Sequence, residues 1–173
     1  GRSGRRRLAR AERLAAAGLG PEPLGLSEGF LALAWIEGQA LGRGPPEAAL
    51  VDAALGHVAH LGHTERTGAP VRAEDLRALL ETNVAEGLGP AWSDRLRPAL
   101  ARHLRHLDGV EAVAVDGRML PQEWLRTPAG HVKADALDHH DDHFFPGTQD
   151  VAWDVAGFAI EFGLHPSPAA ELA

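Results

Sequence analysis

Residues 116–161 read DGRMLPQEWLRTPAGHVKADALDHHDDHFFPGTQDVAWDVAGFAIE, and this stretch decides how the rest of the chain is interpreted. Its last part, residues 135–161, holds six Asp and three His and contains neither Lys nor Arg. Carboxylate oxygens and imidazole nitrogens are ligands that divalent metals use in proteins. The stretch therefore predicts a metal site, or a site where a metal and a phosphate meet.

Short strands and one helix are predicted in and around this stretch. Residues 110–117 alternate between apolar and polar types and are rich in Val, which predicts a strand. Residues 123–127 and 131–135, joined by Pro-Ala-Gly, predict a β-hairpin. Residues 135–149 read as a loop, and the apolar spacing over residues 150–164 predicts a final helix.

The upstream part of the chain predicts mostly helices. Apolar side chains recur at helical spacing in residues 5–17, 47–63, 72–86 and 91–106. The apolar run over residues 30–38, preceded by a turn-rich connector, predicts a buried strand. A run of helices followed by a small sheet and a terminal helix is typical of the α+β class.

Three short motifs carry a resemblance to a known family. Gly117, Pro121 and Leu125 fall on a turn and the strand after it. Val-Lys-Ala-Asp at residues 132–135 ends the second strand, and Ala-Trp-Asp-Val-Ala at residues 152–156 begins a helix. In this layout the chain resembles the kinase-like fold of the aminoglycoside phosphotransferases. The resemblance implies a remnant of the small lobe and hinge over residues 1–44 and a mainly helical large lobe over residues 45–173.

The same resemblance assigns roles to the residues of the turn and the hairpin. It places Asp135 at the position that binds Mg²⁺ and Glu123 at the position of the second metal ligand, which is Asn in the family. Arg118 stands at the position of the catalytic Asp, and a guanidinium cannot accept a proton at neutral pH. Asp116 or Asp138 is then the candidate for orienting the substrate hydroxyl, and Arg118 could instead contact a phosphate.

The hinge expected between the two lobes includes Trp35, Glu37 and Gly38, beside which the adenine of ATP would stack. The glycine-rich phosphate-binding loop and the ion-paired lysine of the family have no counterpart in this chain and are expected upstream of residue 1, in a missing N-terminal segment. We therefore expect this chain alone to be inactive.

Three functions remain open from the sequence. The first is a phosphotransferase, whole or in fragment, that uses ATP and Mg²⁺ to phosphorylate a small hydroxylated substrate. The second is a catalytically silent kinase-fold module that binds a partner or a ligand. The third is a helical protein that holds Zn, Mn or Fe on its His/Asp cluster. The simplest alternative to all metal sites is a solvated acidic loop. The His/Asp cluster of the third function comprises Asp135, Asp138, His139, His140, Asp141, Asp142 and His143.

The amino-acid composition limits the classes of partner and of site that we expect. The formal net charge of −7 disfavours nucleic acid as the main partner. The chain has no Cys, which excludes disulfides and thiolate metal sites, and it has no apolar run long enough for a membrane span. No signal peptide is visible, so we expect a cytoplasmic protein.

Two further expectations concern structural residues. Asp154 should be buried and should brace the catalytic turn through backbone N–H groups, as the resemblance implies. The four Trp residues should lie in the core or between lobes. They are Trp35, Trp92, Trp124 and Trp153.

Overall fold

The computed structural model describes residues 2–142 and 145–164, and it confirms the predicted α+β class. Helices make up about half of the described chain, and the strands form three small separate sheets. Within the described residues no helix is both long and apolar enough to cross a membrane.

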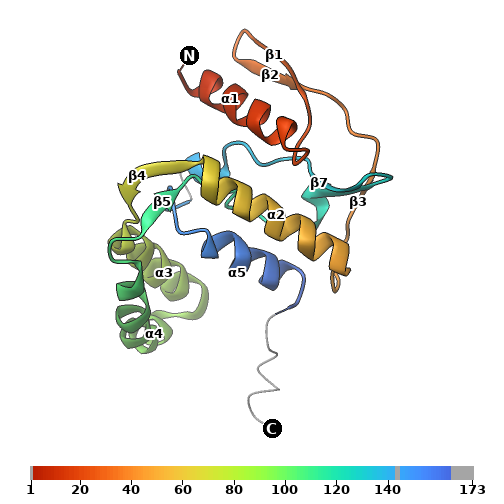
Figure 1. The fold of residues 1–173 in the computed structure, drawn as a ribbon. Helices are drawn as coiled ribbons and strands as arrows, with labels where there is room; N and C mark the ends of the chain where they lie inside the picture. The colour runs from red at the N-terminus through yellow and green to blue at the C-terminus, as the bar shows by residue number, and fades with distance from the viewer. Residues whose placement is uncertain (1, 143–144, 165–173) are drawn as a thin grey trace.

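Two helices form the centre of the fold, α2 (Ala48–Thr64) and α5 (Ala152–Glu161), and they lie side by side in Figure 1. Both were predicted, because their apolar residues repeat at helical spacing and form one face each. These faces enclose the main core together with the start of the predicted hairpin. Its buried members are Leu50, Ala54, Val58, Met119, Trp124, Phe158 and Phe162.

The predicted hairpin is confirmed as β6 (Trp124–Thr127) and β7 (Gly130–Lys133), which pair antiparallel. A short strand, β3 (Gln39–Ala40), adds to the outer edge of β6. The register places Trp124 opposite Lys133, so these two side chains share one face of the sheet. That face is the buried one, since Trp124 and Lys133 are both almost fully enclosed.

A second group of elements lies at one side of the molecule. Helices α3 (Ala73–Leu88) and α4 (Pro90–Leu104) form the antiparallel pair seen at the lower left of Figure 1, and a 3₁₀ turn (η1, Arg105–Leu107) follows. Both helices were predicted. They are joined to the centre by strand β4 (Arg66–Pro70), which pairs with β5 (Glu111–Val113).

This second sheet differs from the prediction. Strand β5 is shorter than the expected strand over residues 110–117, because the chain leaves the sheet to form the turn at Asp116. Strand β4 was not predicted, since Arg-Thr-Gly-Ala-Pro has no alternating apolar pattern and all five of its residues are exposed.

The N-terminal part consists of α1 (Arg2–Ala16) and a hairpin of β1 (Pro23–Ser27) and β2 (Phe30–Leu33), at the top of Figure 1. The predicted buried strand over residues 30–38 is wrong in length and in burial. It ends at Leu33, and Phe30 is 80% exposed. It pairs only with β1, in the segment expected to be a connector, and it also contacts α1. Leu31 and Leu33 are partly buried, whereas Phe30 and Ala32 on the other face are exposed.

The Trp predictions are corrected in the same way. Trp124 is buried in the core, but Trp35 is 84% exposed and Trp92 is 53% exposed. Trp153 is partly buried and packs edge-to-face on Phe145. An aromatic residue is buried only where another element covers it, and neither the β1–β2 hairpin nor the tip of the α3–α4 pair provides that cover.

Candidate functional site around Asp116

Asp116 is the centre of a buried polar network. It follows β5 at the start of the turn, and no part of it is exposed. His57 Nε2, from α2, lies 2.9 Å from Oδ2, and His139 Nδ1 lies 3.2 Å from Oδ1. Lys133 Nζ, at the end of β7, lies 3.4 Å from Oδ2. A distant helix, the end of β7 and the loop that follows β7 therefore meet at one carboxylate.

The backbone of the same turn is held by Asp154. Its Oδ2 accepts the N–H of Asp116 and its Oδ1 accepts the N–H of Gly117, both at 2.8 Å. Asp154 is fully buried in the first turn of α5. Gly117 has φ of +84°, a conformation that other residues rarely adopt. The brace expected of Asp154 is confirmed.

Lys133 is one of the residues whose role the sequence interpretation missed. It is the only Lys in the chain, and its side chain has no exposed surface. Its Nζ donates to Glu123 Oε2 at 2.8 Å and to the backbone carbonyl of Asp135. Lys is almost never buried without such partners. The signal that could have found it is its register opposite the buried Trp124 on the hairpin.

The charges of the network shift its pKa values strongly. Burial alone would raise the pKa of Asp116, but hydrogen bonds from His139 and His57 and the charge of Lys133 outweigh it, so the pKa lies well below its ordinary value. Burial alone would lower the pKa of His139, yet hydrogen bonds to Asp116 and Asp135 raise it to about 9. Asp116 is thus a carboxylate and His139 an imidazolium at neutral pH.

Asp154 shows the opposite shift from Asp116. Burial, followed by repulsion from the Asp116 carboxylate, raises the pKa of Asp154 to about 6, although two backbone N–H groups act to lower it. The pKa of Asp135 is lowered, chiefly by its contact with His139. Two carboxyl groups close together with divergent pKa values are a feature of functional sites, and also of structural ion networks.

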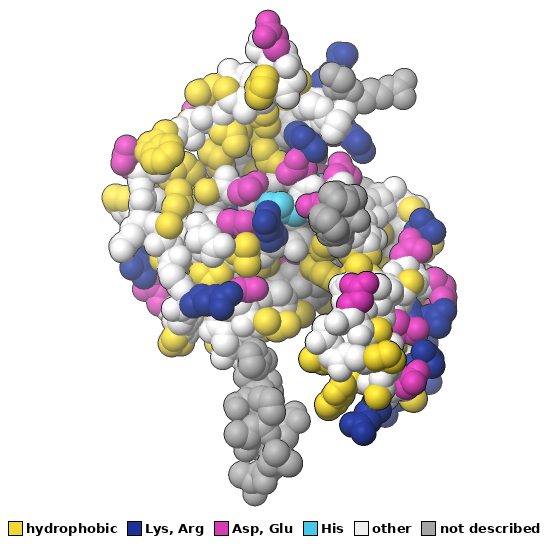
Figure 2. Space-filling model, turned by 180° about the vertical axis from the view of Figure 1, so that it is seen from behind, with side chains coloured by type: hydrophobic (Ala, Val, Ile, Leu, Met, Phe, Trp, Pro, Cys, Tyr) yellow, Lys and Arg dark blue, Asp and Glu magenta, His cyan; other side chains and the backbone are white. Residues whose placement is uncertain are grey.

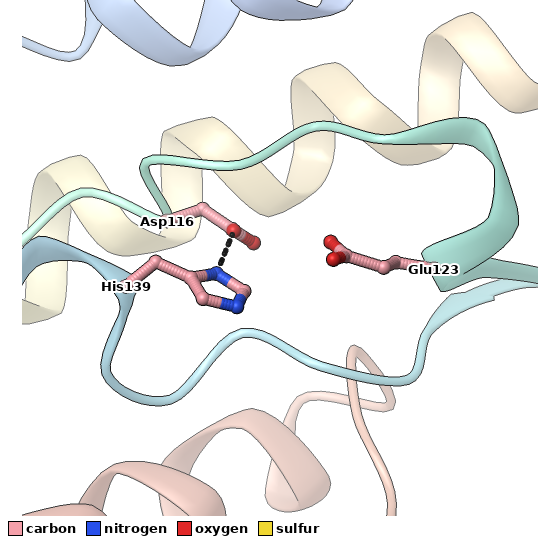
Figure 3. Close-up of side chains that lie close together, drawn as sticks. All are labelled: Asp116, Glu123 and His139. Atoms are coloured by element: carbon pink, nitrogen blue, oxygen red, sulfur yellow. Dashed lines mark hydrogen bonds and ion pairs between the residues drawn. The ribbon is translucent and has the colours of Figure 1, made fainter. Parts of the chain in front are cut away.

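Asp116, Glu123 and His139 form the one group of possible metal ligands in the described part of the chain. Their ligand atoms lie within 4.8 Å of one another, and Figure 3 shows the two carboxylates pointing toward each other with His139 beside Asp116. However, the Lys133 ammonium contacts both acids. An ammonium in this place does not fit a resident Mg²⁺, which needs several free oxygens and its own waters.

The remaining predicted site residues of the turn and the loop have ion-pair partners. Arg118 is half exposed, with Nε 3.6 Å from Glu123 Oε1. Asp135 Oδ2 lies 3.4 Å from His139 Nε2. Asp138, proposed to orient a hydroxyl, pairs with Arg7 of α1 at 2.9 Å.

Within the His/Asp cluster only part of the group converges. His139 reaches Asp116, whereas His140 faces Arg10, with Nδ1 3.5 Å from Nη1. Asp141 lies 4.0 Å from Arg6. His143 lies outside the described residues. The acidic loop is therefore tied to α1 by ion pairs, and it is not simply a solvated acidic segment.

The predicted hinge residues lie on the link between β2 and β3. Trp35 and Glu37 are exposed there, and Gly38 packs closely on β6, where an added Cβ would lie 2.9 Å from the carbonyl oxygen of Arg126. A side chain at position 38 would thus collide with the sheet.

A second missed residue is Arg10 of α1. Its side chain is almost fully buried, and its guanidinium donates to the carbonyl oxygens of Ala136, Ala114 and Val115, at 2.8, 2.7 and 3.1 Å. It thereby ties α1 to both segments that lead into the Asp116 network. No local pattern marks Arg10 among the other arginines of this helix.

Figure 2 shows the face of the molecule opposite to that of Figure 1. A histidine side chain lies at the centre of this face, and Asp and Glu side chains lie around it, with a Lys or Arg side chain directly beside it. Among the residues of the site, Asp135 and Arg118 are both about half exposed, so charges of both signs reach the solvent there.

Comparison with protein-family models, with curated proteins and with solved structures finds no match for this chain.

Proposed function

We propose that this chain is a catalytically silent kinase-like module, which binds a partner or a ligand and does not transfer phosphate. The braced turn supports the kinase-like part of the proposal. Asp154, from the Trp-Asp-Val-Ala helix start, holds the backbone of Asp116 and Gly117, which is the arrangement that the resemblance implies. The fold class and the hairpin after the turn are compatible with it.

The observation that carries the silent part is the contact between Arg118 and Glu123. The resemblance puts the catalytic base at the first position and a metal ligand at the second. In this chain the two positions hold opposite charges, and their side chains lie 3.6 Å apart. A guanidinium cannot take the proton of a hydroxyl, and an acid paired with it is less available to a metal. Both replacements thus act against phosphoryl transfer.

An active phosphotransferase, using ATP and Mg²⁺ on a small hydroxylated substrate, has less support. Its hydroxyl would have to be oriented by Asp116 or Asp138. Asp116 is enclosed by His57, His139 and Lys133, so a substrate hydroxyl could not reach it without displacing them. Asp138 pairs with Arg7 instead. An acid that serves a substrate must come within hydrogen-bond reach of it.

The experiment is a phosphoryl-transfer assay of the purified chain with γ-labelled ATP, Mg²⁺ and a panel of small alcohols and sugars. Circular dichroism and cooperative thermal unfolding establish that the chain is folded. We expect folded protein and no transfer above the background without protein. The double variant Arg118→Asp, Glu123→Asn, which restores the residues of the family at both positions, is assayed beside it, and transfer by this variant alone would show that the two replacements silence the chain. Transfer by the wild-type chain to any acceptor would exclude the silent module.

A further inference from the structure

The ammonium of Lys133 is surrounded by oxygens from three segments. It lies 2.8 Å from Glu123 Oε2, after the turn, and 3.4 Å from Asp116 Oδ2, within the turn. The third oxygen is the carbonyl of Asp135, just beyond β7. An ammonium has three N–H donors and no acceptor. Three oxygens around a nitrogen without solvent exposure match this donor set.

The same two carboxylates belong to the group that could hold a metal. Asp116, Glu123 and His139 bring their ligand atoms within 4.8 Å of one another (Figure 3). A divalent ion held by this group would bind the same two carboxylates that Lys133 already contacts. A metal bound to these carboxylates would lie close to the ammonium. Two cations so close together repel strongly in a buried site, where water screens their charges little. The ammonium and a metal therefore compete for one position.

The ligands that would remain without the ammonium are two carboxylates and the imidazole of His139, which must give up its proton on binding because a metal needs the neutral ring. His139 is held beside them, with Nδ1 3.2 Å from Asp116 Oδ1 and Nε2 3.4 Å from Asp135 Oδ2. A mixed set of oxygens and one imidazole suits Mn²⁺ or Zn²⁺ better than Mg²⁺, which prefers oxygen alone.

We propose that Lys133 is a built-in cation that closes a divalent-metal site formed by Asp116, Glu123 and His139. In the wild-type chain the ammonium takes the place of the ion, so no divalent ion binds between the two carboxylates. A chain that lacks the ammonium binds Mn²⁺ there. This inference depends on the contacts of Lys133 and not on the kinase-like proposal, so either can fail alone.

The test is a titration with MnCl₂, in which electron paramagnetic resonance reports free Mn²⁺. The chains compared are wild type, Lys133→Ala and the double variant Lys133→Ala, Glu123→Gln. We expect wild type to bind Mn²⁺ only weakly. Lys133→Ala should bind one ion per chain, about 10- to 100-fold more tightly, a range typical of changes around metal ligands. The added Glu123→Gln should return binding to the wild-type level, because it removes one carboxylate but leaves the exposed acids of the surface.

Two results would overturn the proposal. One is tight binding of a single Mn²⁺ by wild type that Glu123→Gln abolishes, since the site would then be open despite Lys133. The other is a folded Lys133→Ala chain that binds no more tightly than wild type. Circular dichroism with EDTA and with Mn²⁺ checks folding, and folding of the variant only with Mn²⁺ supports the proposal. If Lys133→Ala is unfolded both with EDTA and with Mn²⁺, the same Mn²⁺ titration is made with Lys133→Gln, whose side chain is neutral and of similar length. Its affinity relative to wild type then decides.

Discussion

Asp154 Oδ1 accepts the backbone N–H of Gly117 at 2.8 Å, although the two residues lie 37 positions apart in the chain. The second oxygen of the same carboxylate accepts the N–H of the preceding residue, Asp116. A carboxylate is an acceptor only, so it satisfies two neighbouring buried donors at once. This contact fixes the turn on which the whole polar network is built.

The brace predicts that Asp154→Asn is strongly destabilising. An amide keeps one acceptor oxygen and presents an NH₂ group to the second backbone N–H, which is left buried without a partner. We expect a loss of about 1–3 kcal/mol in the free energy of unfolding, measured by urea denaturation at pH 7. The control is Asp150→Asn, just before the same helix. There the side chain accepts the N–H of Ala152 near the surface, and Asn caps equally well. Equal losses in the two variants would contradict the brace.

The conformation of Gly117 predicts a second loss of stability, in Gly117→Ala. Two effects destabilise this variant. Alanine is strained at the positive φ of this position, and its Cβ would lie 3.3 Å from the Phe145 ring and 3.4 Å from the Cβ of His139. Gly109→Ala is the matched control, because its φ of +76° is similar and nothing lies within 4 Å of the added Cβ. Each variant should lose about 1–2 kcal/mol from the φ strain. Gly117→Ala should lose more stability than Gly109→Ala because its Cβ also makes close contacts, and thermal unfolding measures both losses. The packing argument fails if the two losses are equal.

The sequence predicts the helices well and the isolated strands poorly, for a physical reason. Helices α2 and α5 have apolar faces that repeat within one element, so the pattern is local. The β6–β7 hairpin was found because its turn residues are also local. By contrast β2 was expected to be buried, but burial depends on a covering layer that no short pattern records.

The residues of the candidate site also fall into those that the sequence predicted and those that it did not. The motif resemblance led to Asp116, Glu123 and Asp154, because their spacing within the turn and the following helix is short or fixed. Arg10 was missed because its role arises from long-range contacts to carbonyl oxygens, and Lys133 was missed although its partners lie in the hairpin and the turn before it. Charged residues are rarely buried, so a sequence interpretation assigns them to the surface by default.

The burial of Arg10 predicts that it anchors α1 to the site. Arg10→Met removes three hydrogen bonds and leaves carbonyl oxygens of Ala114, Val115 and Ala136 without this donor. We expect a loss of about 2–4 kcal/mol, from several bonds of a charged donor. Arg13→Met, on the same helix, breaks a partly exposed pair with Glu65 and should cost at most about 1 kcal/mol. Urea denaturation gives both values, and hydrogen exchange of α1 shows whether the helix itself is released. Similar losses in the two variants would rule out the anchor.

The charge of His139 predicts a loss of stability at alkaline pH. Its pKa in the folded chain is raised from 6.5 to about 9 by Asp116 and Asp135, against the effect of burial. A histidine with a raised pKa contributes stability that is fully present below pH 6.5 and is lost as the pH rises through about 9. The chain has neither Cys nor Tyr, so the other side chains with an ordinary pKa near this window are its remaining histidines.

We therefore expect the free energy of unfolding of wild type to fall by about 1–2 kcal/mol between roughly pH 6.5 and pH 9.5, measured by urea denaturation with EDTA present. His139→Gln should be less stable at the lower pH and should show a much flatter profile, since it has no proton to lose. His63→Gln, at an exposed position of α2, should keep the wild-type profile. Parallel profiles for wild type and His139→Gln would mean that the imidazolium does not stabilise the Asp116 network. Asp116 has the opposite dependence on pH, because its pKa is lowered. Its contribution to the free energy of unfolding is lost only as the pH falls below 3.8.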